Sequence, residues 1–152
     1  GNEIKSLDLS NNPMLENLQL TWNKLKLLDV SHNPKLRILL AAQNELGAVN
    51  ISNNPVLHAL NLSDNKLGLL SAPNSPLLEY FHASNNKLHR LYLSSHHPIL
   101  KEVTLHDNQI VSIDLPGQVR YITLYGNPLD EEEIEFHKQF DYELVLKDPM
   151  IY

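Results

Sequence analysis

One eleven-residue pattern recurs along most of the chain and limits it to a repeat architecture. The clearest copy is LHALNLSDNKL at Leu57–Leu67, which follows the template L-x-x-L-x-L-x-x-N-x-L. Six copies share this template, and their asparagines are 21, 21, 21, 22 and 19 residues apart: Asn23, Asn44, Asn65, Asn86, Asn108 and Asn127. Self-similarity at a period of this size is the sequence signature of a solenoid.

The opening half of each unit has the alternation of a half-buried strand. In the first complete copy this pattern points Leu18 and Leu20 inward and their neighbours outward. Successive copies are expected to pair as a parallel sheet with strands about 4.8 Å apart. The asparagine follows the strand, where the chain turns and leaves backbone groups without ladder partners. Because an amide side chain both donates and accepts hydrogen bonds, we predict a structural role for the six asparagines.

The closing half of each unit is marked by proline. Leu25–Pro34 reads LKLLDVSHNP, and five prolines form a column at similar spacing: Pro13, Pro34, Pro55, Pro76 and Pro98. Proline has no amide proton and a fixed φ, so it suits positions where the chain turns and no ladder donor is needed. This half is too short and too interrupted for a long helix, and an extended or turn-rich convex side is expected.

The template resembles the leucine-rich repeat, over about Ile4 to Leu129. Its 21-residue form, LxxLxLxxNxLxxLDLxxN, is similar to the bacterial IRREKO subclass, seen also in internalin-like surface proteins, with the best match at Leu15–Pro34 and Leu36–Pro55. The resemblance implies an α/β-type, mainly β, right-handed solenoid over residues 1–129. It also implies a parallel concave sheet that presents side chains to a protein or peptide partner.

The repeats begin in the middle of a unit. Residues Ile4–Met14 match the closing half of the template, and nothing before Ile4 could cover the core leucines of an end repeat. We therefore expect a fragment of a longer solenoid, part of a bacterial surface or effector protein. A frayed or dimerised end is the alternative.

The repeat pattern stops after Leu129, and residues 130–152 read as a C-terminal cap. Asp130 is a candidate N-cap, and Glu131, Glu132 and Glu133 suit the positive end of a helix dipole. A short helix to about Phe140 is expected to lay Phe136 and Phe140 over the last repeat. Tyr142–Leu146 then reads as an extended return. This arrangement looks like the C-terminal cap of leucine-rich-repeat proteins, with the acidic run as a solvated face.

Composition excludes several classes of function. The absence of cysteine removes disulfides, thiolate metal sites and cysteine nucleophiles. The net charge of −6 arises from the tail, because residues 1–129 hold ten acidic and ten basic residues while 130–152 hold eight and two. Without a basic stripe, nucleic-acid binding is not expected. No apolar run approaches the ~20 residues of a membrane span. No glycine-rich phosphate loop, G-x-S-x-G or H-E-x-x-H is present, so we expect neither enzyme activity nor a cofactor.

The eight histidines do not suggest a metal site. His82 and His106 could lie on neighbouring strands near Asp107, but they belong to different columns and no third ligand is indicated. His96 and His97 fall in an irregular closing half at an insertion. Since a metal ion needs three or four converging groups, we predict none.

Three columns of outward residues can be read from the aligned strands. Small polar residues surround an apolar spot at Ile38, Leu40 and Ala42 and an aromatic cluster two to four strands along. Aromatic anchors among small polar residues are typical of protein interfaces. The alternative is that these are scattered surface residues, which are normal singly. Trp22 at the rim either extends this surface or covers the turn.

We predict a monomeric module that binds a protein or peptide. The predicted contact residues are Ile38, Leu40, Tyr80, His82, His106, Tyr121 and Tyr125. The alternatives are a structural spacer, or a targeting or regulatory domain of an enzyme whose catalytic part lies elsewhere. The sequence leaves the localisation open: cell surface, secreted or effector if the source is bacterial.

Overall fold

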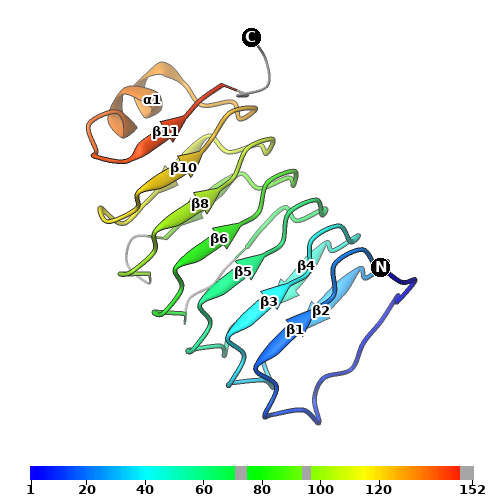
Figure 1. The fold of residues 1–152 in the computed structure, drawn as a ribbon. Helices are drawn as coiled ribbons and strands as arrows, with labels where there is room; N and C mark the ends of the chain where they lie inside the picture. The colour runs from blue at the N-terminus through cyan, green and yellow to red at the C-terminus, as the bar shows by residue number, and fades with distance from the viewer. Residues whose placement is uncertain (71–74, 94–96, 148–152) are drawn as a thin grey trace.

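The chain folds into a stack of short parallel strands joined by turns (Figure 1). The computed structural model describes residues 1–70, 75–93 and 97–147. Seven strands form one sheet in the order β1-β3-β5-β6-β8-β10-β11, so each repeat adds one strand beside the last. These strands are β1 Asn17–Gln19, β3 Ile38–Leu40, β5 Ala59–Asn61, β6 Tyr80–His82, β8 Glu102–Thr104, β10 Tyr121–Thr123 and β11 Glu143–Val145. The predicted mainly β solenoid with a parallel sheet is confirmed.

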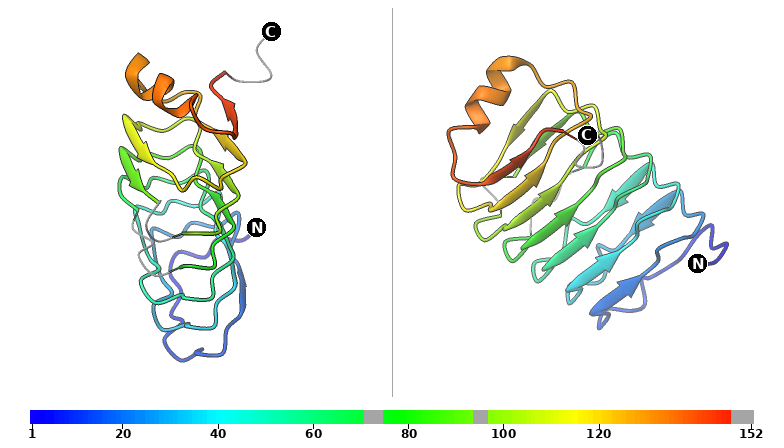
Figure 2. Two further views of the ribbon diagram at one scale, coloured as in Figure 1. Left: turned by 90° about the vertical axis from the view of Figure 1, so that its left-hand side faces the viewer. Right: turned by 45° about the horizontal axis from the view of Figure 1, so that its top comes forward.

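The closing halves lie on the opposite side of the stack (Figure 2). They contain two smaller parallel sheets, β2 (Leu27–Asp29) with β4 (Ala48–Asn50), and β7 (Arg90–Tyr92) with β9 (Ser112–Asp114). The expected extended and turn-rich side is therefore observed, with short strands within it. The insertion expected near Ser94 lies largely outside the described residues.

The core fills the space between the two sides. The central residue of most strands is buried while its neighbours are exposed or half-buried, as alternation predicts. The leucine slots at Leu25, Leu46 and Leu67 are fully buried, and Phe81 is among the largest fully buried side chains. Full burial of such a side chain stabilises the fold by about 1.5–3 kcal/mol.

The repeated asparagines form a ladder of hydrogen bonds through this core. The Asn65 Oδ1 accepts from the Leu46 backbone N–H at 2.9 Å, and its Nδ2 donates to the Ala41 and Leu62 carbonyls at 3.0 Å each. Asn44, Asn86 and Asn108 repeat this arrangement. The residue before each asparagine turns the chain with a positive φ: Trp22, Gln43, Asp64, Asn85, Asp107 and Gly126. Each asparagine thus ties its own repeat to the preceding one at a turn, as a structural role requires.

A second ladder, which the sequence pattern did not predict, runs along the closing halves. Buried Asn54 donates from Nδ2 to the Val30 and Asn33 carbonyls at 3.0 and 2.9 Å, and Asn33 bonds the preceding repeat in the same way. In later repeats different side chains take this position. The Ser75 hydroxyl donates to the Asn54 carbonyl, His97 Nδ1 bonds the Ser75 carbonyl, and Gln118 Nε2 donates to the His97 carbonyl. The first four of these rungs are the residues immediately before Pro34, Pro55, Pro76 and Pro98.

The C-terminal segment closes the stack by a helix and one more strand. Helix α1 (Glu131–His137) begins at Asp130, whose carboxylate accepts from the Glu133 N–H at 2.8 Å, as predicted. It ends three residues before the expected Phe140. Strand β11 then pairs in parallel with β10 and extends the large sheet. No helix in the described ranges has the length and apolar character needed to cross a membrane.

The helix docks through polar side chains, which corrects the prediction for its phenylalanines. Phe136 and Phe140 remain 49% and 39% exposed, whereas His137 is 1% exposed. The Glu133 carboxylate accepts from the backbone N–H of Ile113 at 2.8 Å and lies 3.3 Å from His137 Nε2, while His137 Nδ1 bonds the Tyr142 hydroxyl. Ile113 lies on the edge strand β9, where a further repeat would supply a hydrogen-bond acceptor for its N–H. Glu133 takes that place, so the buried face of α1 carries an acid and an imidazole.

This network gives Tyr142 an unusual titration. Burial, with a smaller contribution from the Glu133 charge, raises the pKa of Tyr142 to about 12 from its ordinary 10.0. The folded state therefore holds this proton more tightly than the unfolded state, and its contribution to stability is complete below pH 10 and lost between pH 10 and 12. Tyrosinate formation would be followed by ultraviolet absorbance in the wild type and in Tyr142→Phe. The variant should lack only the tyrosine that titrates at the highest pH. Loss of an early-titrating one would contradict the assignment.

Candidate protein-binding face

The outer surface of the seven-stranded sheet, called here the seven-stranded face, carries the predicted contact residues in register. The strand pairings place Asn17, Ile38, Ala59, Tyr80, Glu102 and Tyr121 in one line across the sheet. A second line holds Gln19, Leu40, Asn61, His82, Thr104 and Thr123. These are the first two columns expected from the repeat alignment. Whether they bind a partner stays a prediction.

The seven predicted residues are reachable from solvent to different degrees. Tyr80 is the most open, at 41%, and the other six are half-buried. Ala42, which the sequence analysis added to the apolar spot, is only 8% exposed, so Ile38 and Leu40 form that spot alone. Ala42 lies after the strand, ahead of the positive-φ turn at Gln43, and Ser84 is buried at the equivalent position two repeats on. Trp22, which takes the place of Gln43 in the first repeat, is largely exposed.

His82 sits at the centre of the face with two polar neighbours on β8. Its Nδ1 lies 2.9 Å from the Thr104 hydroxyl and its Nε2 lies 3.9 Å from a Glu102 carboxylate oxygen. Desolvation lowers the pKa of His82 below its usual 6.5, and the Glu102 charge opposes this effect without cancelling it. The imidazole is therefore largely neutral at pH 7 and leaves the negative charge of Glu102 uncompensated.

His106 and Tyr125 form a stacked pair at the rim of the face. Their ring centroids are 4.5 Å apart with planes 10° from parallel, and His106 Nδ1 lies 2.9 Å from the Asp107 carboxylate. The turn below is tightly packed, since a Cβ on Gly126, which has φ +68°, would lie 2.2 Å from an Asp107 carboxylate oxygen. The two stacked rings belong to neighbouring repeats and lie four residues along the chain from Glu102 and Tyr121, which share the line of Tyr80.

Strand β11 adds two residues to the face that the repeat pattern did not predict. Glu143 lies in register with Tyr121, and Val145 with Thr123. The sequence predicted an extended return here but contains no repeat match that would set its register. The only available signal was the i, i+2 alternation of Glu143, Leu144 and Val145 next to the cap helix.

Solved structures share this architecture. The leucine-rich-repeat domain of APL1B aligns over 99% of the chain with a TM-score of 0.59 and 17% identity. A leucine-rich-repeat protein of Leptospira interrogans aligns over 93% with a TM-score of 0.56 and 19% identity. This is the leucine-rich-repeat fold. The alignments cover 58% and 52% of those two solved chains, so the present chain spans little more than half their length. No protein-family model matches the sequence, and no curated protein matches it either.

No group of three or more histidine, aspartate or glutamate side chains able to hold a metal ion occurs within residues 1–70, 75–93 and 97–147. His97 is buried in the second ladder, and His96 lies outside the described residues. His82 and His106 bond neighbours on the face, as given above.

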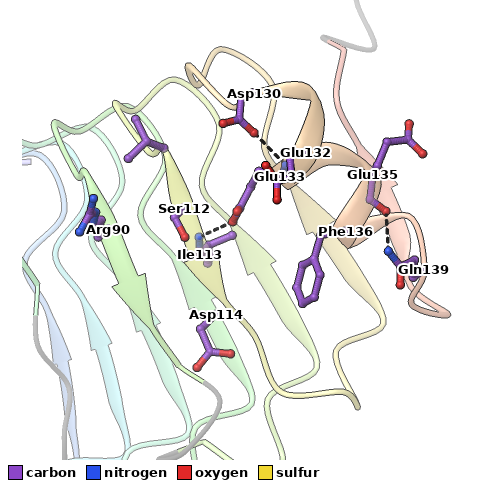
Figure 3. A pocket seen from close by; sticks show the side chains of 11 residues that line it. Arg90, Ser112, Ile113, Asp114, Asp130, Glu132, Glu133, Glu135, Phe136 and Gln139 are labelled. Atoms are coloured by element: carbon purple, nitrogen blue, oxygen red, sulfur yellow. Dashed lines mark hydrogen bonds between the residues drawn. The ribbon is translucent and has the colours of Figure 1, made fainter.

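A second concavity of the leucine-rich-repeat fold lies away from this face, between α1 and the edge of β9. Figure 3 shows its lining, a groove of about 810 Å³ rich in carboxylates from the helix, with Arg90 on the opposite wall. Glu133 points inward to the Ile113 N–H, and Phe136 forms part of the wall. The expected solvated acidic cap face is thus the side of a groove, while one of its glutamates is engaged in docking the helix.

Proposed function

We propose that the chain is a non-catalytic module that binds a protein or peptide on its seven-stranded face. The observation that carries this proposal is the gathering of aromatic side chains at one end of that face. Tyr80 is exposed, Tyr121 is half-buried on β10, and the stacked pair of His106 and Tyr125 stands at the rim. Exposed aromatic anchors with small polar neighbours are the composition that protein interfaces favour.

Rigid display is the proposed mechanism. Each outward side chain is fixed by a strand hydrogen-bonded on both sides, or on one side at the sheet ends, and by a buried neighbour in the core. The face therefore needs little ordering when a partner binds, which preserves affinity that a mobile loop would lose. Ile38 and Leu40 on β3 supply a smaller apolar contact. At about 4.8 Å per strand they lie roughly 19 Å from Tyr121, a span suited to an extended segment or a protein surface.

The proposal extends to the organisation of the chain. We infer repeats over residues 1–129 and a cap over 130–152, of which 148–152 lie outside the described residues. The surface or effector setting implied by the repeat subclass is part of the same proposal, as is a monomeric state. In this view the cap ends the stack and the face performs the recognition.

Replacing Tyr80 and Tyr121 together with alanine should weaken binding of a captured partner by roughly 10- to 100-fold, as expected for two interface anchors. The partner would be captured with the wild-type protein from its own environment and its Kd measured by calorimetry. The matched control is Leu27→Ala with Leu69→Ala, which removes two exposed side chains from the opposite side. Urea unfolding should show both variants folded.

The control also defines the contrary result. Unchanged affinity in the tyrosine variant, together with lost affinity in the leucine variant, would move the site to the opposite side. If neither variant alters binding, recognition lies outside this face and the spacer interpretation is preferred.

A further inference from the structure

Four side chains in one line of the seven-stranded face alternate between tyrosine and glutamate. Tyr80 on β6 is in register with Glu102 on β8, Glu102 with Tyr121 on β10, and Tyr121 with Glu143 on β11. Figure 1 shows these four strands lying next to one another at the C-terminal end of the stack. We call this line the Tyr–Glu row. All four residues are exposed or half-buried on the same face.

The carboxylates of the row lack basic partners that would neutralise them. The nearest base to Glu102 is His82, at 3.9 Å, and that imidazole is largely neutral for the reason given above. Glu143 forms no ion pair with any residue of the described ranges. Of the two cations that precede these strands, Lys101 pairs with Glu79, and Arg120 lies more than 4 Å from every described carboxylate. The row therefore presents two negative charges to solvent.

A carboxylate between two aromatic rings is suited to a cationic side chain. Ammonium and guanidinium groups are attracted to the faces of tyrosine rings, and arginine can also form paired hydrogen bonds with a carboxylate. Neither Tyr80 nor Tyr121 has a ring contact with another described aromatic side chain, so both rings remain available to a ligand. The charges of the row therefore favour a cationic partner, whereas its aromatic rings alone would not distinguish a cationic partner from an apolar one.

We propose that the Tyr–Glu row recognises a basic peptide segment in the polyproline II conformation with cationic residues three positions apart. This inference rests on the proposed function and adds the chemistry of the partner. Glu102 and Glu143 are two strands apart, which corresponds to about 9.6 Å. A polyproline II helix has three residues per turn and rises about 3.1 Å per residue, so residues i and i+3 point the same way and lie about 9.3 Å apart. A segment running across the strands therefore places one cation over Glu102, between the two tyrosines, and the next over Glu143, beside Tyr121.

The test uses synthetic peptides of four Pro-Pro-Arg units and four Pro-Pro-Gln units, titrated by calorimetry and by NMR amide shifts of the intact chain. A third peptide has the arginine peptide's composition with its four arginines contiguous. We expect the Pro-Pro-Arg peptide to bind at least tenfold more tightly than the glutamine peptide and to prefer spaced over contiguous arginines. Glu102→Gln or Glu143→Gln should each weaken binding by roughly fivefold, and 300 mM salt should weaken it relative to 20 mM.

The matched control is Glu131→Gln, which, like each row variant, removes one negative charge, here from the acidic cap helix. Binding lost in this control and retained in the row variants would overturn the proposal in favour of non-specific attraction to the cap. Equal affinity for the arginine and glutamine peptides would also overturn it. In that case a captured partner that still depends on Tyr80 and Tyr121 would leave the binding function standing, whereas a partner indifferent to both tyrosines would remove the function as well.

Discussion

Replacing Asn65 with alanine is expected to destabilise the protein by about 3 kcal/mol. The Asn65 side chain accepts from Leu46 N–H and donates to the carbonyls of Ala41 and Leu62, and all three of these bonds are buried. Alanine leaves the buried Leu46 N–H without a partner. The Ala41 and Leu62 carbonyls each lose one of two amide donors and keep the other, from Asn44 at 3.2 Å and Asn86 at 3.0 Å. Each unpaired buried group costs about 1–3 kcal/mol, and the loss falls in the middle of a stack in which each repeat is stabilised by its neighbours.

Urea unfolding followed by circular dichroism would measure this change. The matched control is Asn53→Ala, because Asn53 also donates across repeats, to the Ser31 carbonyl at 3.0 Å, but is exposed. Water replaces that bond when the amide is removed, so a change of at most about 1 kcal/mol is expected. Similar losses from both substitutions would mean that the buried ladder is not what holds consecutive repeats together.

The first ladder could be predicted from sequence because every rung uses the same residue. The second ladder could not be recognised as easily, because its rungs change from Asn33 and Asn54 to Ser75, His97 and Gln118. All of these side chains can bond the carbonyl of a neighbouring repeat, so the hydrogen bond is kept although the residue type changes. A histidine at such a rung resembles a candidate ligand when only the sequence is known.

The columns of the face were predictable for a similar reason. Once the repeat period fixes the alignment, the two-residue period of a strand determines which side chains share a line and point outward. The position after the strand is less regular, because Ala42 and Ser84 are buried there while His106 and Tyr125 are half-exposed. Contact residues read from an alignment are therefore placed better within a strand than at its end.

The cap was predicted as a helix and an extended return, but its docking was not. Apolar residues are the usual guide to a buried helix face, and they favoured Phe136 and Phe140. The determining feature is instead an unpaired backbone N–H at Ile113, on the edge strand, which an acceptor on the helix must satisfy. The need for this hydrogen-bond acceptor arises at the end of the sheet, so the sequence of the helix alone does not reveal it. Glu143 was not predicted for a similar reason, since its place on the face follows from the pairing of β11 with β10 and not from its own segment.

Adjacent residues on β6 should respond to alanine substitution in opposite ways. Phe81 is 1% exposed, points into the core and is among its largest side chains. Phe81→Ala should lower the free energy of unfolding by about 3–5 kcal/mol, through lost transfer energy and the cavity left behind. Tyr80 is the next residue and points outward, so Tyr80→Ala should change stability by less than about 1 kcal/mol while weakening partner binding.

Chemical denaturation of the two single variants, with partner affinity measured on each, would separate these roles. Because the substitutions are one residue apart on the same strand, differences in backbone propensity or repeat position cannot explain opposite results. A Phe81→Ala protein that remains folded at low denaturant should still bind, since the outward side chains keep their strand pairings. If instead Tyr80→Ala proved as destabilising as Phe81→Ala, the tyrosine would be a packing residue. The aromatic end of the face would then no longer be supported as a binding site.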